Sequence, residues 1–176
     1  DVYKRQECYD PFIISDIGDW IMYDLDGGTT WGANAVDFEN ESYVGTGIIY
    51  NDELATPTGG PVPEWDTYQG DQGLYFVASG ANGTTIPNDD WMISPEFSLS
   101  GITSPIFSMK AKSVNDTYGL ERFQIAVGNS TDYNEFTIIS DGAYIEAPTE
   151  WTTYEFDLSA YDCLLYTSDA ADDLRC

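Results

Sequence analysis

Short segments in which apolar and polar residues alternate recur along the whole chain, and none shows the 3.6-residue apolar repeat of an amphipathic helix. The segment 105–112 is the clearest, since Phe107, Met109 and Ala111 fall on one side of an extended chain and polar residues on the other. Similar segments, separated by glycine, proline and asparagine, lie at 74–78, 91–94, 121–127, 136–139 and 152–158. Many short strands at this spacing predict an all-β sandwich of two antiparallel sheets.

One long segment, 51–71, interrupts this pattern. It contains three prolines and three glycines, which break regular secondary structure. We expect it to be an excursion over the surface, where binding residues are often found.

The two ends of the chain are related through their coding DNA. Residues 1–6, DVYKRQ, can be encoded by GATGTGTATAAGAGACAG, and the reverse complement of that DNA, read one base out of frame, encodes CLLYTS. CLLYTS is the sequence at 163–168, so the ends form an inverted repeat that resembles the mosaic-end adapter of transposase-based sequencing libraries. We therefore expect residues 1–6 and 163–176 to be adapter-derived, and one domain, cut at both ends, to occupy 7–162.

Acidic residues dominate the charge of the chain. Within 7–162 there are 27 acidic and three basic residues, which accounts for −24 of the total net charge of −25. Such a surface repels nucleic acid and anionic lipids, so we expect neither as a partner, and it attracts divalent cations. The same charge would also keep a secreted protein soluble without any bound ion. No apolar run approaches the roughly 20 residues of a membrane-spanning helix, so we expect no membrane insertion.

Histidine is absent from the chain, and Cys8 is the one cysteine between residues 7 and 162. This composition excludes catalysis by Ser-His-Asp or Cys-His groups, histidine-bound zinc, and a disulfide within that segment. We also expect a protein that is not an enzyme, because nothing distinguishes its carboxylates, which could act without histidine, from a solvated acidic surface.

Three strings occur in a fixed order: DWIMYDLDGGTTW at 19–31, NDDWMISPEFSLSG at 88–101 and EWTTYEFDLSAYD at 150–162. They resemble the cleaved-adhesin and choice-of-anchor J domains of bacterial surface proteins such as the gingipain haemagglutinins. The pattern of those domains runs W-x-x-x-D-x-D-G-D-G-x-x-W, then D-N-W-L-I-S-P, then W-x-x-x-x-x-D-L-S-x-Y. The resemblance implies a MAM-like jelly-roll β-sandwich whose C-terminal strands, which would follow residue 162, are missing here.

Asp24 and Asp26, followed by two glycines, form a tight acidic loop. Alternate aspartates in an irregular turn suit a hard, oxygen-seeking cation. The loop is not an EF-hand, because Gly28 and Ala35 stand where the fifth and twelfth positions need acids, and the adhesin pattern also has an aspartate at Gly28. The resemblance implies calcium, so we expect a structural Ca²⁺ at Asp24 and Asp26, with Glu7 as a weaker ligand.

Two other interpretations of these acids stay open. Asp24 and Asp26 could form Asx turns without any metal. The residues 88–90, Asn-Asp-Asp, could close a second oxygen cluster or form the turn that enters the next strand, with Trp91 in the core.

Four aromatic residues in loop-like segments are candidate ligand-binding residues, because flat rings can stack on sugars or contact a protein partner: Trp31, Trp65, Tyr68 and Tyr118. For each of them, burial beneath its own loop is the alternative.

The resulting hypothesis is a non-catalytic adhesion or binding module, extracellular or on the bacterial cell surface, within a larger multidomain protein. Its expected partners are extracellular proteins or glycans. One alternative is a jelly-roll glycoside hydrolase or lyase that uses carboxylate pairs such as Glu39 with Glu41 or Glu64 with Asp66. Another is a structural spacer module.

Overall fold

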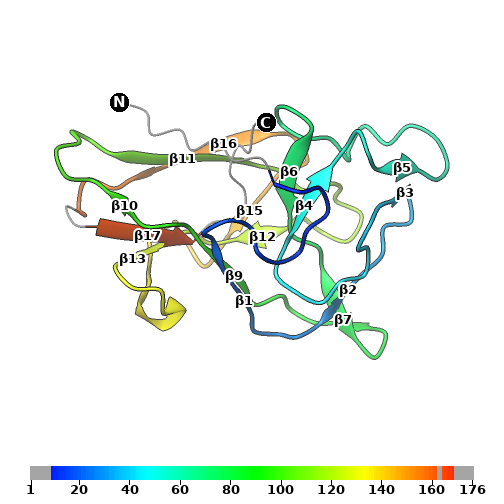
Figure 1. The fold of residues 1–176 in the computed structure, drawn as a ribbon, viewed down its shortest axis with the longest axis horizontal. Helices are drawn as coiled ribbons and strands as arrows, with labels where there is room; N and C mark the ends of the chain where they lie inside the picture. Colours follow the sequence, from blue (N-terminus) through cyan, green and yellow to red (C-terminus); the bar gives the residue numbers. More distant parts are fainter. Residues whose placement is uncertain (1–8, 162–163, 169–176) are drawn as a thin grey trace.

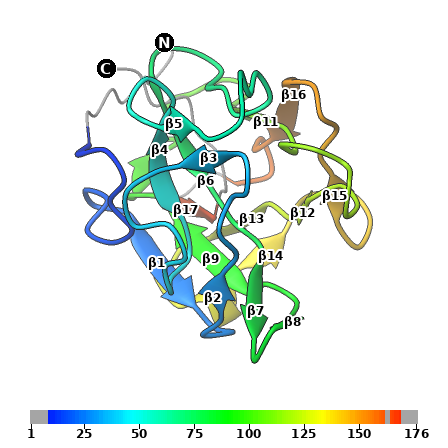
Figure 2. The same cartoon turned by 90° about the vertical axis from the view of Figure 1, so that its right-hand side faces the viewer.

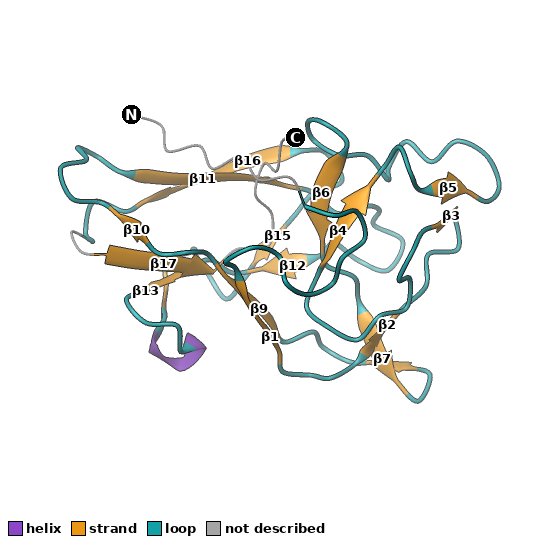
Figure 3. Cartoon of the chain, viewed as in Figure 1, coloured by secondary structure: helices purple, strands orange, loops and turns teal. Residues whose placement is uncertain are grey.

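The computed structural model of the protein describes residues 9–161 in full and residues 164–168 as backbone. Strands and loops make up this part of the chain, and its helical content is one 3-10 turn, η1 (Tyr133–Glu135) (Figure 3). The prediction of an all-β fold built from antiparallel sheets is therefore confirmed.

One layer of the molecule is a six-stranded antiparallel sheet in the order β1-β9-β17-β13-β14, with β10 also paired to β17 (Figure 1). Its strands are β1 (Ile21–Asp24), β9 (Asp90–Ile93), β10 (Phe97–Ser98), β13 (Ala126–Gly128), β14 (Thr137–Ile138) and β17 (Leu164–Ser168). Strands β9 and β10 follow one another along one side of β17, and β13 lies along its other side.

Two strand pairs form the opposing layer, and Figures 1 and 2 show both on the same side of the six-stranded sheet. They are β4 (Ile48–Asn51) with β6 (Gln72–Tyr75), and β11 (Ile106–Ala111) with β16 (Thr152–Asp157). Apolar side chains fill the space between the layers. Met92 of β9 packs with Ile49 and Leu74 of the β4–β6 pair, and Met109 of β11 packs with Ile125.

Within the described residues, short strands form three further small sheets at the periphery. They are β2 (Thr29–Thr30), β7 (Ser79–Ala81) and β8 (Thr84–Thr85); β3 (Val36–Asp37) with β5 (Thr56–Pro57); and β12 (Arg122–Phe123) with β15 (Ile145–Glu146). The β2-β7-β8 sheet is separate from the sheet that contains β1, but Ser79 of β7 donates to Asp26 in the turn after β1, so this small sheet lies beside the end of that strand.

The predicted strands at 105–112 and 152–158 are found as β11 and β16, which pair with each other. The single strand predicted at 121–127 is instead divided into β12 and β13. The break falls at Ile125, which is fully buried and whose N–H donates to the hydroxyl of Ser140 rather than to a neighbouring strand. A hydrogen bond to the side chain of Ser140, fifteen residues away in the sequence, thus replaces the strand pairing that alternation alone predicts for this N–H.

Much of the segment 51–71 is exposed, as predicted, but it is attached to the core. Ala55 is buried, and Trp65 packs between the rings of Phe38, Tyr50 and Tyr75. Packing of this kind fixes the segment even though most of its residues lack regular structure.

Strand β17 comes from the segment for which the sequence predicts an adapter origin. Its backbone pairs with β13 and β10, so these residues fill a position inside the six-stranded sheet. Any extended segment can satisfy the backbone groups of two neighbouring strands. The pairing therefore does not test where residues 163–176 come from, and their adapter origin stays a prediction.

Candidate metal centre

Three aspartates gather where β1 ends and β9 begins. The antiparallel register places Asp24 opposite Asp90, two residues from the paired Met22 and Met92. Since side chains alternate along a strand, the two aspartates point to the same side as these methionines, toward the core. Asp26 follows in the turn after β1, and carboxylate oxygens of Asp24, Asp26 and Asp90 all lie within 4.8 Å of one another.

Hydrogen bonds hold the acidic loop in shape. The N–H of Gly27 donates to Oδ1 of Asp24 at 2.7 Å, and the N–H of Gly28 donates to Oδ1 of Asp26 at 2.7 Å. The hydroxyl of Ser79, in β7, also donates to Oδ1 of Asp26 at 3.1 Å. These are Asx-type turns, as one interpretation predicted, but here they aim carboxylates at a shared point.

Both glycines are required by this geometry. Gly27 has φ +61°, which is the left-handed region that glycine adopts without strain. At Gly28 a Cβ would lie 2.5 Å from Oγ of Ser79 and 2.6 Å from Oδ1 of Asp26. Gly28 stands where the adhesin pattern has an aspartate, so this chain uses the position for close packing instead.

The residues 88–90 complete this cluster and do not form a second one. The N–H of Asp89 donates to Oδ2 of Asp26 at 2.9 Å, and the N–H of Leu25 donates to the carbonyl of Asp89 at 3.0 Å. Asn88 accepts from the backbone N–H of Ser79 at 3.0 Å. Of the two open interpretations of residues 88–90, a separate oxygen cluster is not the one found, because the β1–β9 register brings both acidic strings to one place.

Negative charges lie close together in this cluster, and one of its carboxyl groups has a raised pKa. Burial raises the pKa of Asp90 to about 7, and the negative charges of Asp26, Asp24 and Asp89 add to this effect. Burial and the charges of Asp90 and Asp24 also raise the pKa of the Tyr43 hydroxyl. Within the described part of the chain, Oδ1 of Asp90 and the hydroxyl of Tyr43 are the buried side-chain atoms without a hydrogen-bond partner. A buried carboxylate oxygen without a partner is costly unless a cation meets it.

The donor set fits a calcium ion. Calcium binds oxygen ligands at about 2.3–2.6 Å, so two ligands of one ion lie up to about 5 Å apart. The three carboxylates satisfy that limit and supply only oxygen. Asp24, Asp26 and Asp90 are the residues that would hold the ion, whereas the predicted ligand Glu7 lies outside the described residues.

The four aromatic candidates occupy different environments. Trp65 is partly buried against the core cluster, where its ring packs against those of Phe38, Tyr50 and Tyr75. Trp31 and Tyr68 are each 43% exposed, and Tyr118 is 96% exposed. Tyr68 contacts Trp151 and lies under the ammonium of Lys110, 4.4 Å from its ring centroid.

A second half-buried aspartate, Asp66, has a full set of partners. One carboxylate oxygen forms an ion pair with Nζ of Lys112, and the other accepts from Nε1 of Trp151 at 3.1 Å. Lys112 also donates to the carbonyl of Glu64 at 2.7 Å, and its side chain is 6% exposed. These contacts attach the 51–71 segment to the end of β11 and to the start of β16, through the carboxylate of Asp66 and the backbone carbonyl of Glu64.

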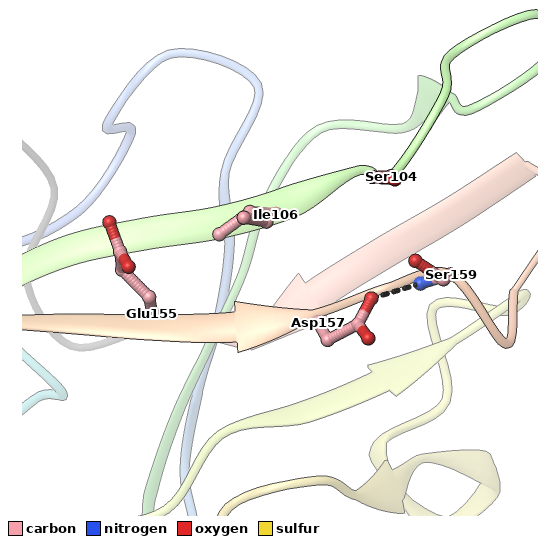
Figure 4. A pocket seen from close by; sticks show the side chains of 5 residues that line it. All are labelled: Ser104, Ile106, Glu155, Asp157 and Ser159. Carbon is pink, nitrogen blue, oxygen red and sulfur yellow. Dashed lines mark hydrogen bonds between the residues drawn. The ribbon is translucent and has the colours of Figure 1, made fainter.

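A shallow pocket of about 280 Å³ lies on the outer face of the β11–β16 pair, lined by Ser104, Ile106, Glu155, Asp157 and Ser159 (Figure 4). Its two acids project from the same strand. Hydrogen bonds from the hydroxyl and then the backbone N–H of Ser159 hold the pKa of Asp157 below its ordinary value. That shift is opposite to the one needed by the general acid of a glycosidase.

Glu39 with Glu41 is the other carboxylate pair that the glycosidase alternative suggested. Oε1 of Glu41 accepts from the backbone N–H of Ala33. This contact ties Glu41 to the segment that follows β2.

A membrane-spanning helix is not found among the described residues.

Comparison with solved structures gives a match to the K1 cleaved adhesin domain of Lys-gingipain from Porphyromonas gingivalis W83. The TM-score is 0.51 at 14% sequence identity, over 87% of this chain and 82% of that one. No protein-family model and no curated protein matches the sequence. The resemblance predicted from the three ordered strings is confirmed at the level of the fold, and this chain has the β-sandwich fold of a cleaved adhesin domain.

Proposed function

We propose that this protein is a non-catalytic adhesion module of a bacterial extracellular or surface protein, stabilised by Ca²⁺, that binds an extracellular protein or a glycan. Its fold, shared with a cleaved adhesin domain, supports the adhesion role. Fold alone does not define a function, so the proposal depends on the chemistry of the sites.

The observation that supports calcium is the unpartnered Oδ1 of Asp90 between Asp24 and Asp26. A bound Ca²⁺ supplies positive charge that offsets the repulsion among the three carboxylates. The residues themselves come from β1, from the turn after it and from β9, so the ion would join segments 64 positions apart in the sequence, from Asp26 to Asp90. Calcium in this role stabilises the fold and takes no part in a reaction.

Loops near the cluster belong to the same hydrogen-bonded unit. Ser79 joins Asp26 to β7, and β7 pairs with β2. The ion would therefore fix the positions of the exposed residues at this end of the sandwich, including Trp31. Binding surfaces made of loops gain affinity when they are ordered before the partner arrives.

The test is a binding assay in calcium and in chelator. The purified chain is applied to a glycan array and to immobilised extracellular matrix and plasma proteins, with Asp90→Asn as the matched variant. We expect binding to at least one surface in calcium, weakened in chelator and in the variant. No binding to any of these surfaces in calcium would contradict the adhesion role and favour a spacer module.

A further inference from the structure

The indole of Trp31 is held in an open position at the edge of the β2-β7-β8 sheet. The N–H of Trp31 donates to the carbonyl of Ala78 at 2.9 Å, which extends the β2–β7 pairing by one residue. The ring lies across Gly80, where a Cβ would be 2.5 Å from Cζ2 and 2.9 Å from Cε2 of the indole. Gly80 thus supports one side of the ring, while 43% of the residue stays exposed to solvent.

The carboxylate of Glu41 contacts the two residues that follow Trp31. Oε1 of Glu41 accepts from the N–H of Ala33, and it lies 3.3 Å from the position that a Cβ on Gly32 would take. Gly32 and Ala33 directly follow Trp31 in the chain. We call Trp31, Glu41 and Gly80 together the Trp31 surface.

The chain itself offers no cation to this surface within the described residues. Lys110 lies over Tyr68, and Arg122 lies over Tyr144 at 4.2 Å from its ring centroid. Lys112 pairs with Asp66 and lies over Trp151 at 5.4 Å from its ring centroid. These three are all the basic residues between 7 and 162. Each of them contacts an aromatic ring of its own, and Trp31 has none of these contacts.

We propose that the Trp31 surface binds an arginine or lysine side chain of a basic protein partner, with the cation over the indole and paired with the carboxylate of Glu41. This inference rests on the proposed function as a binding module and specifies the chemistry of its partner. Tryptophan is the best ring for a cation, and arginine is enriched at the centres of interfaces. The net charge of −25 attracts a basic partner over long range and repels an acidic one.

The experiment measures the affinity of an arginine–serine repeat peptide by calorimetry with calcium present. A citrulline–serine repeat keeps the shape of the peptide and removes its charge. We expect Trp31→Ala to weaken binding of the arginine peptide roughly three- to thirty-fold, the range for a cation–π contact. Glu41→Gln keeps an acceptor for the N–H of Ala33 and should also weaken binding, whereas Leu54→Ala, which removes an apolar side chain that is 61% exposed and is not assigned to binding, should leave it unchanged.

Nuclear magnetic resonance gives a second readout that a general attraction between opposite charges would not produce. The indole N–H signal of Trp31, assigned by its loss in Trp31→Phe, should shift on titration, and the citrulline peptide should not shift it. Equal affinity of wild type, Trp31→Ala and Glu41→Gln for the arginine peptide would overturn the proposal. Equal binding of the arginine and citrulline peptides, or Trp31-dependent binding of neutral glycans only, would overturn it as well.

The proposed function and this inference can fail separately. If the chain binds immobilised proteins or glycans equally well in wild type and Trp31→Ala, the module binds through another surface and the inference alone is wrong. If wild type binds the arginine peptide through Trp31 but no extracellular protein or glycan, the Trp31 surface is real and the adhesion role is wrong.

Discussion

Asp66 and Asp90 are both half-buried aspartates, and their surroundings differ in one respect. Asp66 has a cation, Lys112, on one oxygen and the N–H of Trp151 on the other. Asp90 has an oxygen without a partner and like charges from Asp24 and Asp26 around it. The chain neutralises the carboxylate of Asp66 with its own lysine, so Asp66 forms a structural contact. The carboxylate of Asp90 keeps an oxygen without a partner, so Asp90 is the candidate ion ligand.

The largest expected effect comes from removing the internal counter-charge. Lys112→Met leaves Asp66 beside Trp151 without a cation and the carbonyl of Glu64 without its donor. Breaking a buried pair costs about 3–5 kcal/mol, and we expect a loss of about 3 kcal/mol because the Asp66 side chain is 44% exposed. Urea unfolding measures this, and the loss should be the same in calcium and in chelator.

Lys110→Met is the matched control for that variant. Lys110 lies on the same face of β11 but contacts Tyr68 and the hydroxyl of Thr153 rather than a carboxylate. Its removal should cost about 1 kcal/mol or less. An equal loss in the two variants would mean that Asp66 and Lys112 are not a stabilising pair.

A smaller change in stability, a gain rather than a loss, is expected from Asp90→Asn in the absence of calcium. The folded protein raises the pKa of Asp90 from 3.8 to about 7, so the folded state disfavours its ionised form. In chelator this group therefore lowers stability progressively as pH rises from about 4 to about 7. Asp90→Asn should raise the melting midpoint in chelator at pH 8 and give no such gain near pH 4.

Equal melting midpoints of wild type and Asp90→Asn in chelator at pH 8 would contradict this prediction. They would mean that the ionised carboxylate of Asp90 does not lower the stability of the fold. Asp157→Asn is a useful contrast, because the pKa of Asp157 is lowered by its hydrogen bonds with Ser159. Its contribution is present above the ordinary pKa and is lost as pH falls, which is the opposite direction.

The smallest expected effect on stability comes from Gly28→Ala. The new methyl group would push against the Ser79 hydroxyl and the Asp26 carboxylate, so the calcium-induced rise in melting temperature should shrink. In chelator the variant should also lose some stability, because the methyl group would meet Cβ of the buried Ser79 at 2.8 Å as well as the two side-chain oxygens. Gly83→Ala is the control, because Gly83 has φ +76° with open space around it, and it should lower stability without changing the calcium response.

Local pattern predicted the parts of this molecule that depend on neighbouring residues. Alternation located β11 and β16, and the spacing of Asp24 and Asp26 located two of the three acids at the candidate site. The third acid, Asp90, depends on which strands pair and in which register, and neither is encoded in a short string. The role of Asp66 likewise required knowing that Lys112, distant in sequence, lies beside it.

Two other features show the same limit. Trp65 has the loop-like sequence surroundings of a ligand-binding residue, yet its ring packs with Tyr50 and Tyr75 because the 51–71 segment folds back on β4 and β6. Ile125 lies between β12 and β13, where its N–H donates to the hydroxyl of Ser140, fifteen residues away. Hydrophobic pattern predicts which residues are buried, and tertiary pairing decides what they pack against.

Thermal unfolding of wild type and Asp90→Asn, each in calcium and in chelator, tests the candidate metal centre most directly. At a free calcium concentration 100 times the dissociation constant, a single site stabilises the folded state by about 2.7 kcal/mol. For a domain of this size that corresponds to a rise of about 5–10 °C in wild type, which we expect to vanish in Asp90→Asn. A wild-type midpoint unmoved by calcium, or an equal rise in Asp90→Asn, would contradict calcium binding by the three aspartates.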